Sequence, residues 1–220
     1  AGSKTYLGLQ DDCDVEEFYR CIDRAEKKHI SFDYDRYVNS FPSEQGDQYL
    51  IPGGTIHASG RNQVVLEIGS YTIGSYTFKL YDYLRSDLDG NPRPIHSIHG
   101  KNVLVTDRRR SRIDGVLRPK PVTVRQGDSW KEEIVGEHEL IYFSLRRLSF
   151  EHDISDNTDG KFHVLVLVEG DEVLICSKSD PTLCYHQKHM DMIVVPASMG
   201  EYEIINLGKI PCRITKTMLK

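Results

Sequence analysis

Apolar residues near the start of the chain are spaced as on one face of a helix. Asp14 is a favourable N-cap, and Glu17 three residues later completes the pattern of a capping box. The apolar residues that share this face are Val15, Phe18, Ile22 and Ala25. The pattern predicts one amphipathic helix, preceded by an extended segment at 5–9 and followed by a shorter helical piece at 32–38.

After Pro42 the pattern changes to that of strands. The apolar runs become short, are rich in Val, Ile, Tyr and Phe, and are separated by Gly, Pro, Asp and Asn. We expect strands at 49–51, 64–68, 76–83, 140–150, 164–168, 173–176, 192–195, 202–205 and 212–217. Such spacing is typical of antiparallel sandwiches and barrels. The predicted fold class is therefore mainly β.

This pattern predicts two barrel-like blocks, and an arginine-rich stretch joins them. We place the first domain at 1–105, a linker at 106–121 and the second domain at 122–220. The linker contains Arg108, Arg109, Arg110 and Arg112. Such a cluster can bind phosphate or nucleic acid, but no aromatic residues are interleaved with it. We therefore favour a solvated linker that balances the acidic surface.

The composition is that of an ordinary globular protein. Of 220 residues, 39% are hydrophobic and 28% charged, and the formal net charge of −5 predicts neither a nucleic-acid nor a membrane partner. No long apolar stretch or signal-peptide pattern is visible. The cysteines include no C-x-x-C pair, so we expect reduced thiols and a cytoplasmic location. They are Cys13, Cys21, Cys176, Cys184 and Cys212.

The most informative segment, 46–60, contains a single histidine. It reads Gly, five residues, Pro, one residue, Gly, two residues, His. Pro52 and the glycines after it predict a tight turn with backbone angles that residues with a β-carbon resist. The turn brings His57 onto the next strand, where a neutral imidazole can ligate a metal. This spacing resembles the second motif of the cupin barrels, although Arg61 stands where that motif has Asn.

A single imidazole does not make a metal site. A histidine on a strand is more often a core or surface residue, but the complete turn here favours metal ligation. The cupin resemblance implies further ligands from an earlier motif, and no segment before Gly46 supplies it. We therefore expect a first barrel that is incomplete at its N-terminus, with the other ligands upstream of Ala1.

The second block repeats the turn in degraded form. The corresponding residues are Met190, Pro196, Ser198 and Glu201. Glu201 takes the place of His57, and Met190 takes that of Gly46. We expect this second cupin-like barrel to be structural and without a metal site.

Segments after the turn extend the resemblance to an enzyme family. They read L-E at 66–67, T-F-K-L-Y-D-Y at 77–83 and D-L-D-G-N-P-R-P-I-H at 87–96. These resemble the patterns L-E, Y-R-L-Y-D-[WY] and D-x-x-G-x-P-R-x-L-H of type I mannose-6-phosphate isomerases. Residues 162–170 and 193–202 resemble the closing motifs of the same family.

The resemblance implies a zinc-dependent aldose–ketose isomerase that interconverts mannose 6-phosphate and fructose 6-phosphate. It implies one Zn²⁺ per complete active site, with His57 as one ligand. The chemistry needs a base that removes a proton next to a carbonyl, a cation for the enediolate oxygen and a cation for the phosphate.

The resemblance also implies roles for four further residues. Glu67 matches a family carboxylate near the metal and is a candidate proton carrier, but it can equally be a strand residue that faces solvent. Lys79 replaces a family arginine at the sugar, which keeps the charge and loses the planar fork. Arg85 and Arg93 can reach a phosphate or pair with nearby aspartates such as Asp82.

Alternation along the expected strand makes a further prediction. If Lys79 points into a cavity, Tyr81 and Tyr83 do so too, and Asp82 does not. His96 and His99 invite a metal interpretation, but the family context favours a structural role for them.

Two other functions fit parts of the sequence. A non-catalytic cupin module that binds a sugar phosphate is favoured by Lys79 in the place of arginine. An iron oxygenase would need two His and one carboxylate, which the visible chain does not provide. We expect an isomerase of hexose 6-phosphates whose C-terminal part, the 220 residues, is inactive without an N-terminal segment of the same protein.

Overall fold

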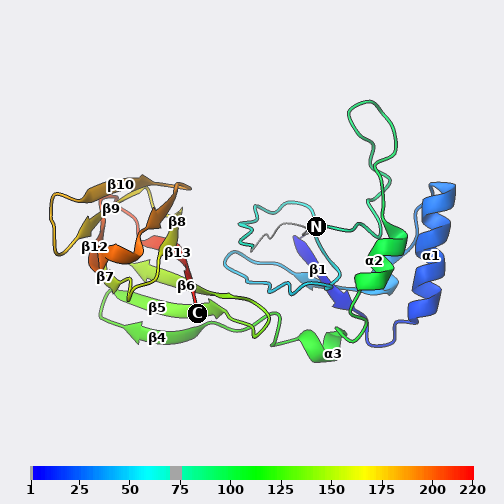
Figure 1. Ribbon diagram of the computed structural model, residues 1–220, viewed down its shortest axis with the longest axis horizontal. Coiled ribbons are helices and arrows are strands. Elements are labelled where there is room, and N and C mark those ends of the chain that lie inside the picture. Colours follow the sequence, from blue (N-terminus) through cyan, green and yellow to red (C-terminus); the bar gives the residue numbers. More distant parts are fainter. Residues whose placement is uncertain (1, 70–75) are drawn as a thin grey trace. The chain divides into compact units, whose positions relative to one another are not determined.

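The fold is described from a computed structural model, for residues 2–69 and 76–220. The chain divides into two compact units, which we call unit 1 (residues 1–47 and 51–118) and unit 2 (residues 48–50 and 119–220). Figure 1 shows that strands dominate, so the predicted mainly β class is confirmed. None of the described helices is both long and apolar enough to span a membrane.

Unit 1 combines a small antiparallel sheet with short helices. Its strands are β1 (Lys4–Leu9), β2 (Val38–Pro42) and β3 (His57–Ser59), in the order β2-β1-β3. The helices are α1 (Val15–Lys28), the 3-10 turn η1 (Tyr34–Arg36), α2 (Ser97–Val103) and α3 (Arg110–Ile113).

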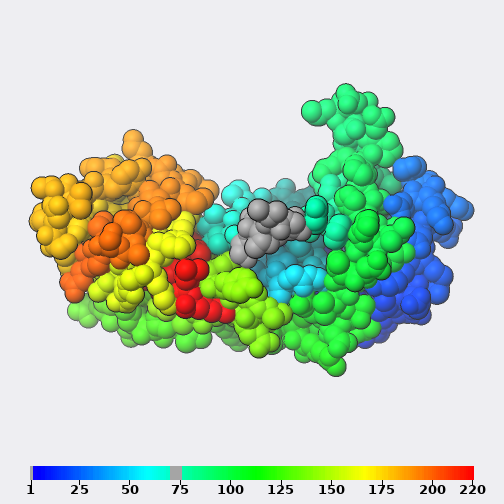
Figure 2. Space-filling model, in the orientation of Figure 1, coloured from blue at the N-terminus to red at the C-terminus, as the bar shows by residue number. Residues whose placement is uncertain are grey.

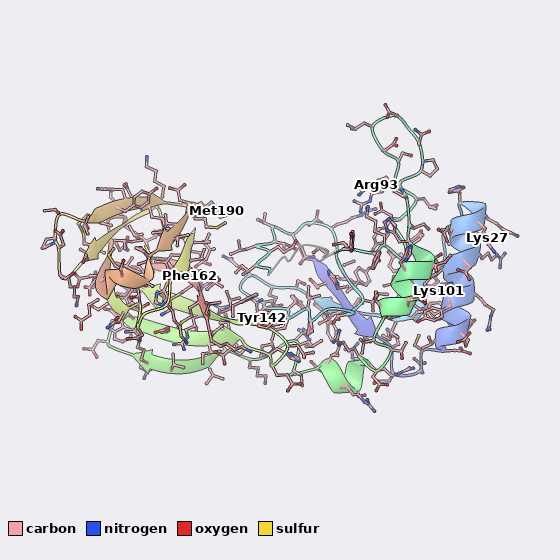
Figure 3. The ribbon with its side chains drawn as sticks, in the orientation of Figure 1. Lys27, Arg93, Lys101, Tyr142, Phe162 and Met190 are labelled. Carbon is pink, nitrogen blue, oxygen red and sulfur yellow. A yellow bond between two sulfur atoms is a disulfide. The ribbon has the colours of Figure 1, made fainter. Side chains whose placement is uncertain are left out.

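Helix α1 begins where the capping pattern predicts. The Asp14 carboxylate accepts a hydrogen bond of 3.0 Å from the Glu17 backbone N–H, which satisfies one free donor of the first turn. The predicted apolar face is buried and packs against β1 and β2 through Phe18, Ile22, Leu9, Tyr37 and Val38. On the neighbouring helix α2, Lys101 (labelled in Figure 3) binds Asp23 of α1 at 2.5 Å, a contact that connects the two helices.

Three strands expected in unit 1 and at its boundary do not form. Residues 49–51, 64–68 and 76–83 belong to none of the sheets in the described part of the chain. Val64 is 91% exposed, and the backbone turns at Tyr83 and Leu84, where φ is 55° and 56°. Alternating apolar residues favour a strand only where another strand supplies hydrogen-bond partners.

The segment 84–93 forms a loop that projects from unit 1 (Figures 1 and 2). A bridge between Ser86 and Pro92 closes it, and the backbone N–H of Arg93 donates to the Arg85 carbonyl at 3.0 Å. Leu88 lies fully exposed in this loop.

The segment 106–121, expected to be a solvated linker, folds into unit 1 over most of its length. Ile113 and Leu117 are buried. The Arg118 guanidinium stacks on the Phe41 ring at 4.2 Å, and Arg109 Nη1 binds three backbone carbonyls near the start of α1. Bonds from arginine to backbone carbonyls leave no trace in a charge pattern, so sequence reasoning could not find them.

Unit 2 is a sandwich of two antiparallel sheets. One sheet has the order β10-β9-β12-β7 and the other the order β11-β8-β13-β6-β5-β4. The strands are β4 (Val122–Gln126), β5 (Trp130–Gly136), β6 (Phe143–Phe150), β7 (Asp153–Asn157), β8 (His163–Glu169), β9 (Glu172–Ser177), β10 (Cys184–Lys188), β11 (Met192–Val195), β12 (Glu201–Asn206) and β13 (Cys212–Leu219), with a 3-10 turn η2 (Ala197–Met199) before β12.

All six strands predicted in this block form, and four strands were missed. The missed strands are β4, β5, β7 and β10, which contain charged and polar residues at many positions. Side chains from both sheets fill the interior between them: Leu148, Phe150, Ile154, Leu165, Leu167, Val173, Ile175, Tyr202, Ile204 and Ile214.

One cysteine pair departs from the expectation of reduced thiols. Cys176 on β9 lies directly opposite Cys184 on β10, and the two form a disulfide with a Cα–Cα distance of 4.2 Å. The expectation was wrong for this pair, because it depended on sequence spacing and not on strand register. Cys13, Cys21 and Cys212 are free thiols.

Candidate functional site

The turn before His57 has the form that its residues predict. The Thr55 backbone N–H donates to the Pro52 carbonyl at 3.1 Å, and the Thr55 hydroxyl donates to the same oxygen at 2.6 Å. Gly54 has a φ of 79°, and a Cβ at this position would lie 2.6 Å from the Val103 carbonyl oxygen. Glycine is therefore required both by the backbone angle and by the close approach of a second segment.

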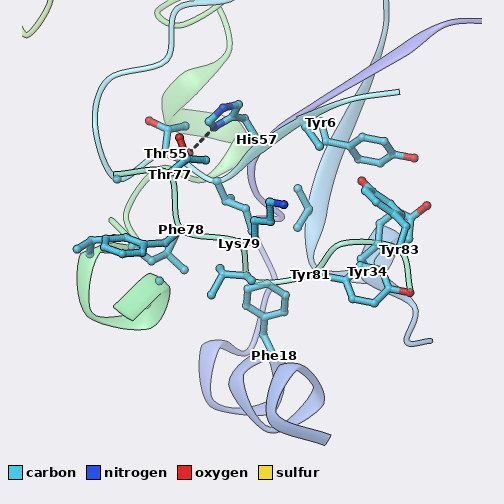
Figure 4. A pocket seen from close by; sticks show the side chains of 18 of the residues that line it. Tyr6, Phe18, Tyr34, Thr55, His57, Thr77, Phe78, Lys79, Tyr81 and Tyr83 are labelled. Atoms are coloured by element: carbon cyan, nitrogen blue, oxygen red, sulfur yellow. Dashed lines mark hydrogen bonds between the residues drawn. The ribbon is translucent and has the colours of Figure 1, made fainter. Parts of the chain in front are cut away.

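His57 begins strand β3, opposite Leu7 of β1. Its Nδ1 lies 2.9 Å from the Thr55 carbonyl oxygen, the contact drawn in Figure 4. A carbonyl can only accept a hydrogen bond, so Nδ1 carries a proton, and in a neutral ring Nε2 keeps its lone pair. The contact thus orients the ring and leaves Nε2 as the atom that can bind a metal.

A cavity of about 230 Å³ lies beside this histidine, inside unit 1. In Figure 4, His57 and Thr55 are on one side of the cavity, a group of tyrosines is on the other, and Lys79 lies between them. The tyrosines are Tyr6, Tyr34, Tyr81 and Tyr83. The wall therefore combines polar groups with aromatic faces, as in sites that bind small molecules.

The tyrosines pack around one central ring. The Tyr34 centroid lies 5.5 Å from that of Tyr6, 5.8 Å from that of Tyr81 and 5.2 Å from that of Tyr83. Burial raises the pKa of Tyr6 well above its usual range, and the hydrogen bond with Tyr34 raises it further. Burial also raises the pKa of Tyr81 and of Tyr83. These hydroxyls stay neutral and can exchange hydrogen bonds with the hydroxyls of a ligand.

Next to the cavity, a buried carboxylate collects three cations. Asp82, 6% exposed, binds Arg85 Nη2 at 2.6 Å through Oδ1, and it binds Arg93 Nε at 3.0 Å and Lys79 Nζ at 3.3 Å through Oδ2. Burial alone would raise the pKa of Asp82, but hydrogen bonds from Arg85 and Lys79 outweigh burial and lower it. Two positive charges remain in excess, so the cluster favours an anion.

Comparisons with known proteins point in one direction. No protein-family model matches the chain. The chain is 27% identical over 174 residues to "Putative mannose-6-phosphate isomerase YvyI" of Bacillus subtilis, a match that covers 79% of this chain and 50% of that protein. It is 25% identical over 189 residues to the mannose-6-phosphate isomerase ManA of Bacillus subtilis, which covers 86% of this chain and 53% of that protein.

A solved structure extends these matches to the fold. The crystal structure of the mannose 6-phosphate isomerase from Bacillus subtilis matches with a TM-score of 0.69 at 18% identity, over 98% of this chain and 60% of that one. The chain is related to the mannose-6-phosphate isomerases. It spans about half the length of the two Bacillus proteins that it matches in sequence. The resemblance seen in the sequence motifs is confirmed.

Lys79 lies on the cavity wall, and its role at the sugar stays a prediction. Tyr81 and Tyr83 line the cavity with it, as alternation predicted. Phe78 and Leu80 line the cavity as well, because this segment is not a regular strand and its side chains do not alternate between two faces.

The two candidate phosphate ligands lie elsewhere. Arg85 and Arg93 are not among the residues that line the cavity, and both bind Asp82, the alternative that the sequence left open. They stand at the base of the projecting loop (Figure 3 labels Arg93). Contact with a phosphate stays a prediction for both.

Glu67 lies in the exposed segment 64–68 and does not line the cavity. The structure therefore does not bring this carboxylate together with His57 and Lys79. Its role as a proton carrier stays a prediction that depends on the family resemblance.

Two further histidines support the cavity wall from behind. His96 Nδ1 accepts a hydrogen bond of 3.2 Å from the Lys79 backbone N–H, and His99 stacks on Phe78 with centroids 5.5 Å apart. Among the described residues, no group of three or more His, Cys, Asp or Glu could hold a metal ion. His57 thus fits the role of one zinc ligand, and the described residues do not complete a zinc site.

Sequence reasoning missed Tyr6 and Tyr34 as cavity residues. Tyr6 comes from β1 and Tyr34 from η1, and the fold brings both to the segment at 77–83. No local pattern predicts that the two tyrosines meet, because each one looks like an ordinary apolar position of its own strand or helical turn.

Proposed function

We propose that the chain belongs to a zinc-dependent aldose–ketose isomerase that interconverts mannose 6-phosphate and fructose 6-phosphate. One observation carries the proposal: His57 and Lys79 face the same cavity in a chain related to mannose-6-phosphate isomerases.

The cavity wall suits a sugar. Aromatic faces pack against the C–H groups of a pyranose or furanose, while phenol hydroxyls bond its polar edge. Tyr6, Tyr34, Tyr81 and Tyr83 offer both kinds of surface within one wall. A hexose would therefore be held and oriented by the side of the cavity that faces away from His57.

The cation at the cavity suits the charge that the reaction develops. Removal of a proton next to the carbonyl places negative charge on the enediolate oxygen, and a positioned cation stabilises this charge. Lys79 Nζ reaches the cavity from a backbone held by His96 and is itself bound to Asp82. Lys79 would thus stabilise the enediolate or hold the phosphate, and Glu67 is our candidate for the proton carrier.

Zinc, when bound, would polarise the sugar carbonyl. His57 Nε2 would be one ligand. We propose that the other ligands come from a segment of the same protein that the 220 residues do not include. Without them a single imidazole holds zinc weakly, so we expect the 220-residue chain to be inactive and to purify without stoichiometric zinc. Metal analysis of the purified chain checks this, and one zinc per chain would contradict it.

The test of the activity uses protein extended by this proposed segment. We expect conversion of mannose 6-phosphate to fructose 6-phosphate, with exchange of solvent deuterium into the sugar, to stop on chelation and return with Zn²⁺. Turnover that resists chelation would contradict the zinc dependence, and absence of both turnover and exchange would contradict the isomerase.

A binding module for sugar phosphates is the second candidate. The lysine at position 79, in the place of a family arginine, favours it, because the planar fork that holds two oxygens at once is lost. Tight binding of mannose 6-phosphate without deuterium exchange would identify this function.

A further inference from the structure

Arg108 makes a set of contacts that the proposed function does not use. Its Nη1 lies 3.0 Å from the Pro52 carbonyl oxygen, 2.6 Å from the Gly53 carbonyl oxygen and 2.5 Å from the Thr55 hydroxyl. All three acceptors belong to the turn that leads to His57. A half-buried guanidinium therefore connects both sides of this turn.

Thr55 transmits these contacts to the histidine. Its hydroxyl donates to the Pro52 carbonyl and accepts from Arg108, while its own carbonyl accepts the Nδ1 proton of His57. The side chain of Thr55 is fixed by the first two bonds, and its peptide group is the acceptor in the third. A change in the turn thus moves the acceptor that sets the orientation of the imidazole.

The backbone of Arg108 is fixed in turn. The Arg108 carbonyl accepts the Leu9 N–H at 2.9 Å, and the Val105 N–H donates to the Gly54 carbonyl at 2.9 Å. Leu9 belongs to β1, the strand that pairs with β3. Arg108 therefore contacts the turn through its side chain and the neighbouring sheet through its backbone.

We propose that Arg108 is a positioning residue, which holds the turn at 52–55 so that His57 keeps its proton on Nδ1 and presents Nε2 to a metal. The metal part of this inference rests on the proposed function, whereas the orientation of the ring does not. Arg108 lies in the segment that the sequence indicated as a solvated linker.

The test compares two neighbouring arginines. Arg108→Met keeps the apolar stem and removes the three contacts with the turn. Arg109→Met is the matched control, because Arg109 Nη1 also binds three acceptors, the carbonyls of Gln10, Asp11 and Cys13 at 3.2, 3.0 and 3.0 Å. Both variants lose a guanidinium and three hydrogen bonds, but only one loses them at the turn.

The readout is the tautomer of His57, observed through the ¹⁵N shifts of its ring at a fixed pH of about 8, where imidazole is neutral. His57→Gln assigns the signals. We expect the Nδ1–H form in the unmodified chain and after Arg109→Met, and a mixture of both tautomers after Arg108→Met. In protein with a complete zinc site, we expect Arg108→Met to lower zinc affinity roughly 10- to 100-fold.

An Nδ1–H tautomer that persists after Arg108→Met would overturn the inference, whether or not the protein is an isomerase. If that variant does not fold, Arg108→Gln takes its place, since it keeps a polar side chain but removes the guanidinium from all three acceptors, and an unchanged tautomer then has the same meaning. Conversely, the expected shift in a protein without isomerase activity would contradict the proposed function and leave the positioning role intact.

Discussion

The chain contains the same turn twice, once in each unit, and the two copies lead to different surroundings. In unit 1 the Thr55 N–H donates to the Pro52 carbonyl at 3.1 Å, and in unit 2 the Met199 N–H donates to the Pro196 carbonyl at 3.0 Å. The proline and the backbone bond to the third residue after it are retained. The glycine two residues after the proline is not, because Ser198 stands there in unit 2.

The residue six positions before each proline also differs between the two units, although its backbone conformation is similar. Gly46 has a φ of 88°, and Met190 in unit 2 has a φ of 66°. The Met190 backbone N–H donates to the Leu167 carbonyl at 2.8 Å, which holds the residue in this left-handed conformation. A residue other than glycine can therefore occupy this left-handed position when a backbone hydrogen bond to a neighbouring strand holds it.

The residues after the turn differ much more between the two units. In unit 1 the imidazole of His57 borders a cavity, whereas in unit 2 Glu201 takes its place and the next residue, Tyr202, is fully buried. Lys216 also fills this interior and bridges the carboxylates of Glu132 and Asp156 at 2.8 and 2.6 Å. A binding site therefore needs open space as well as a suitable side chain.

The largest effect that we expect concerns this buried ion network. Lys216→Met leaves two buried carboxylates without their shared cation, so we expect the free energy of unfolding to fall by about 3–5 kcal/mol. Urea unfolding measures this. Arg112→Met is the control, because Arg112 pairs with Asp107 on the surface and should change stability by less than about 1 kcal/mol. Equal effects of the two substitutions would show that the buried network does not stabilise unit 2 more than a surface pair does.

Lys79 tests the cavity of unit 1, the feature that the interior of unit 2 lacks in the comparison above. We expect Lys79→Met to lower kcat of protein with a complete zinc site by roughly 100- to 1000-fold, the range for loss of one group that stabilises developing charge. Lys101→Met is the matched control, since Lys101 binds Asp23 between two helices and does not line the cavity. An isomerase assay decides, and similar rates for both variants would remove Lys79 from the active site.

Met190 tests whether a residue other than glycine destabilises this left-handed position of unit 2. We expect Met190→Gly to raise the free energy of unfolding by about 0.5–1 kcal/mol, because relief of a left-handed side chain, about 1–2 kcal/mol, exceeds the entropy cost of glycine, about 0.5–1 kcal/mol. Urea unfolding measures the change. A loss of stability would mean that packing of the methionine side chain outweighs backbone strain.

The smallest effect concerns pH. Burial lowers the pKa of His163, Lys216 lowers it further, and Asp156 opposes both. The folded protein therefore takes up this proton less readily than the unfolded chain, so its contribution to stability is complete above pH 6.5, the ordinary value, and is lost as the pH falls from there toward the folded pKa.

Glu132 also contributes stability that is lost as the pH falls, but at lower pH. Burial alone would raise the pKa of Glu132, but Lys216 and Arg125 lower it to about 2, so its contribution is lost between pH 4.5 and about 2. Unfolding midpoints measured across pH separate the two groups. We expect His163→Gln to flatten the step that begins at pH 6.5 and the exposed His189→Gln to leave it unchanged. A step that survives His163→Gln would assign it to another group.

Local patterns predicted those parts of the molecule in which local interactions decide the structure. The Asp14 cap and the apolar face of α1 depend on neighbours along the chain, and the bonds from Thr55 to Pro52 that close the turn before His57 lie within the turn itself. The alternating strands of unit 2 were found because both of its sheets have a buried inner face.

Sequence patterns failed where a partner far along the chain determines the local structure. The segment at 64–68 alternates as a strand does, yet no neighbouring strand in the described part of unit 1 pairs with it. The contacts of Arg108 with backbone carbonyls and the approach of Tyr34 to Tyr81 depend on the tertiary fold. His57 and one part of the cavity wall, with Lys79, Tyr81 and Tyr83, could therefore be predicted. Tyr6, Tyr34 and the support from Arg108 could not.

The carboxylate of Asp82 gives the projecting loop a practical use. Arg85 and Arg93 at the two arms of the loop bind the same side chain that binds Lys79, and the bridge between Ser86 and Pro92 closes the arms above them. The contacts that hold the loop lie at its base, whereas Leu88 at its tip is fully exposed to solvent. We therefore expect that a reporter group or an inserted peptide at the tip leaves the fold intact and responds to ligand binding in the neighbouring cavity without entering it.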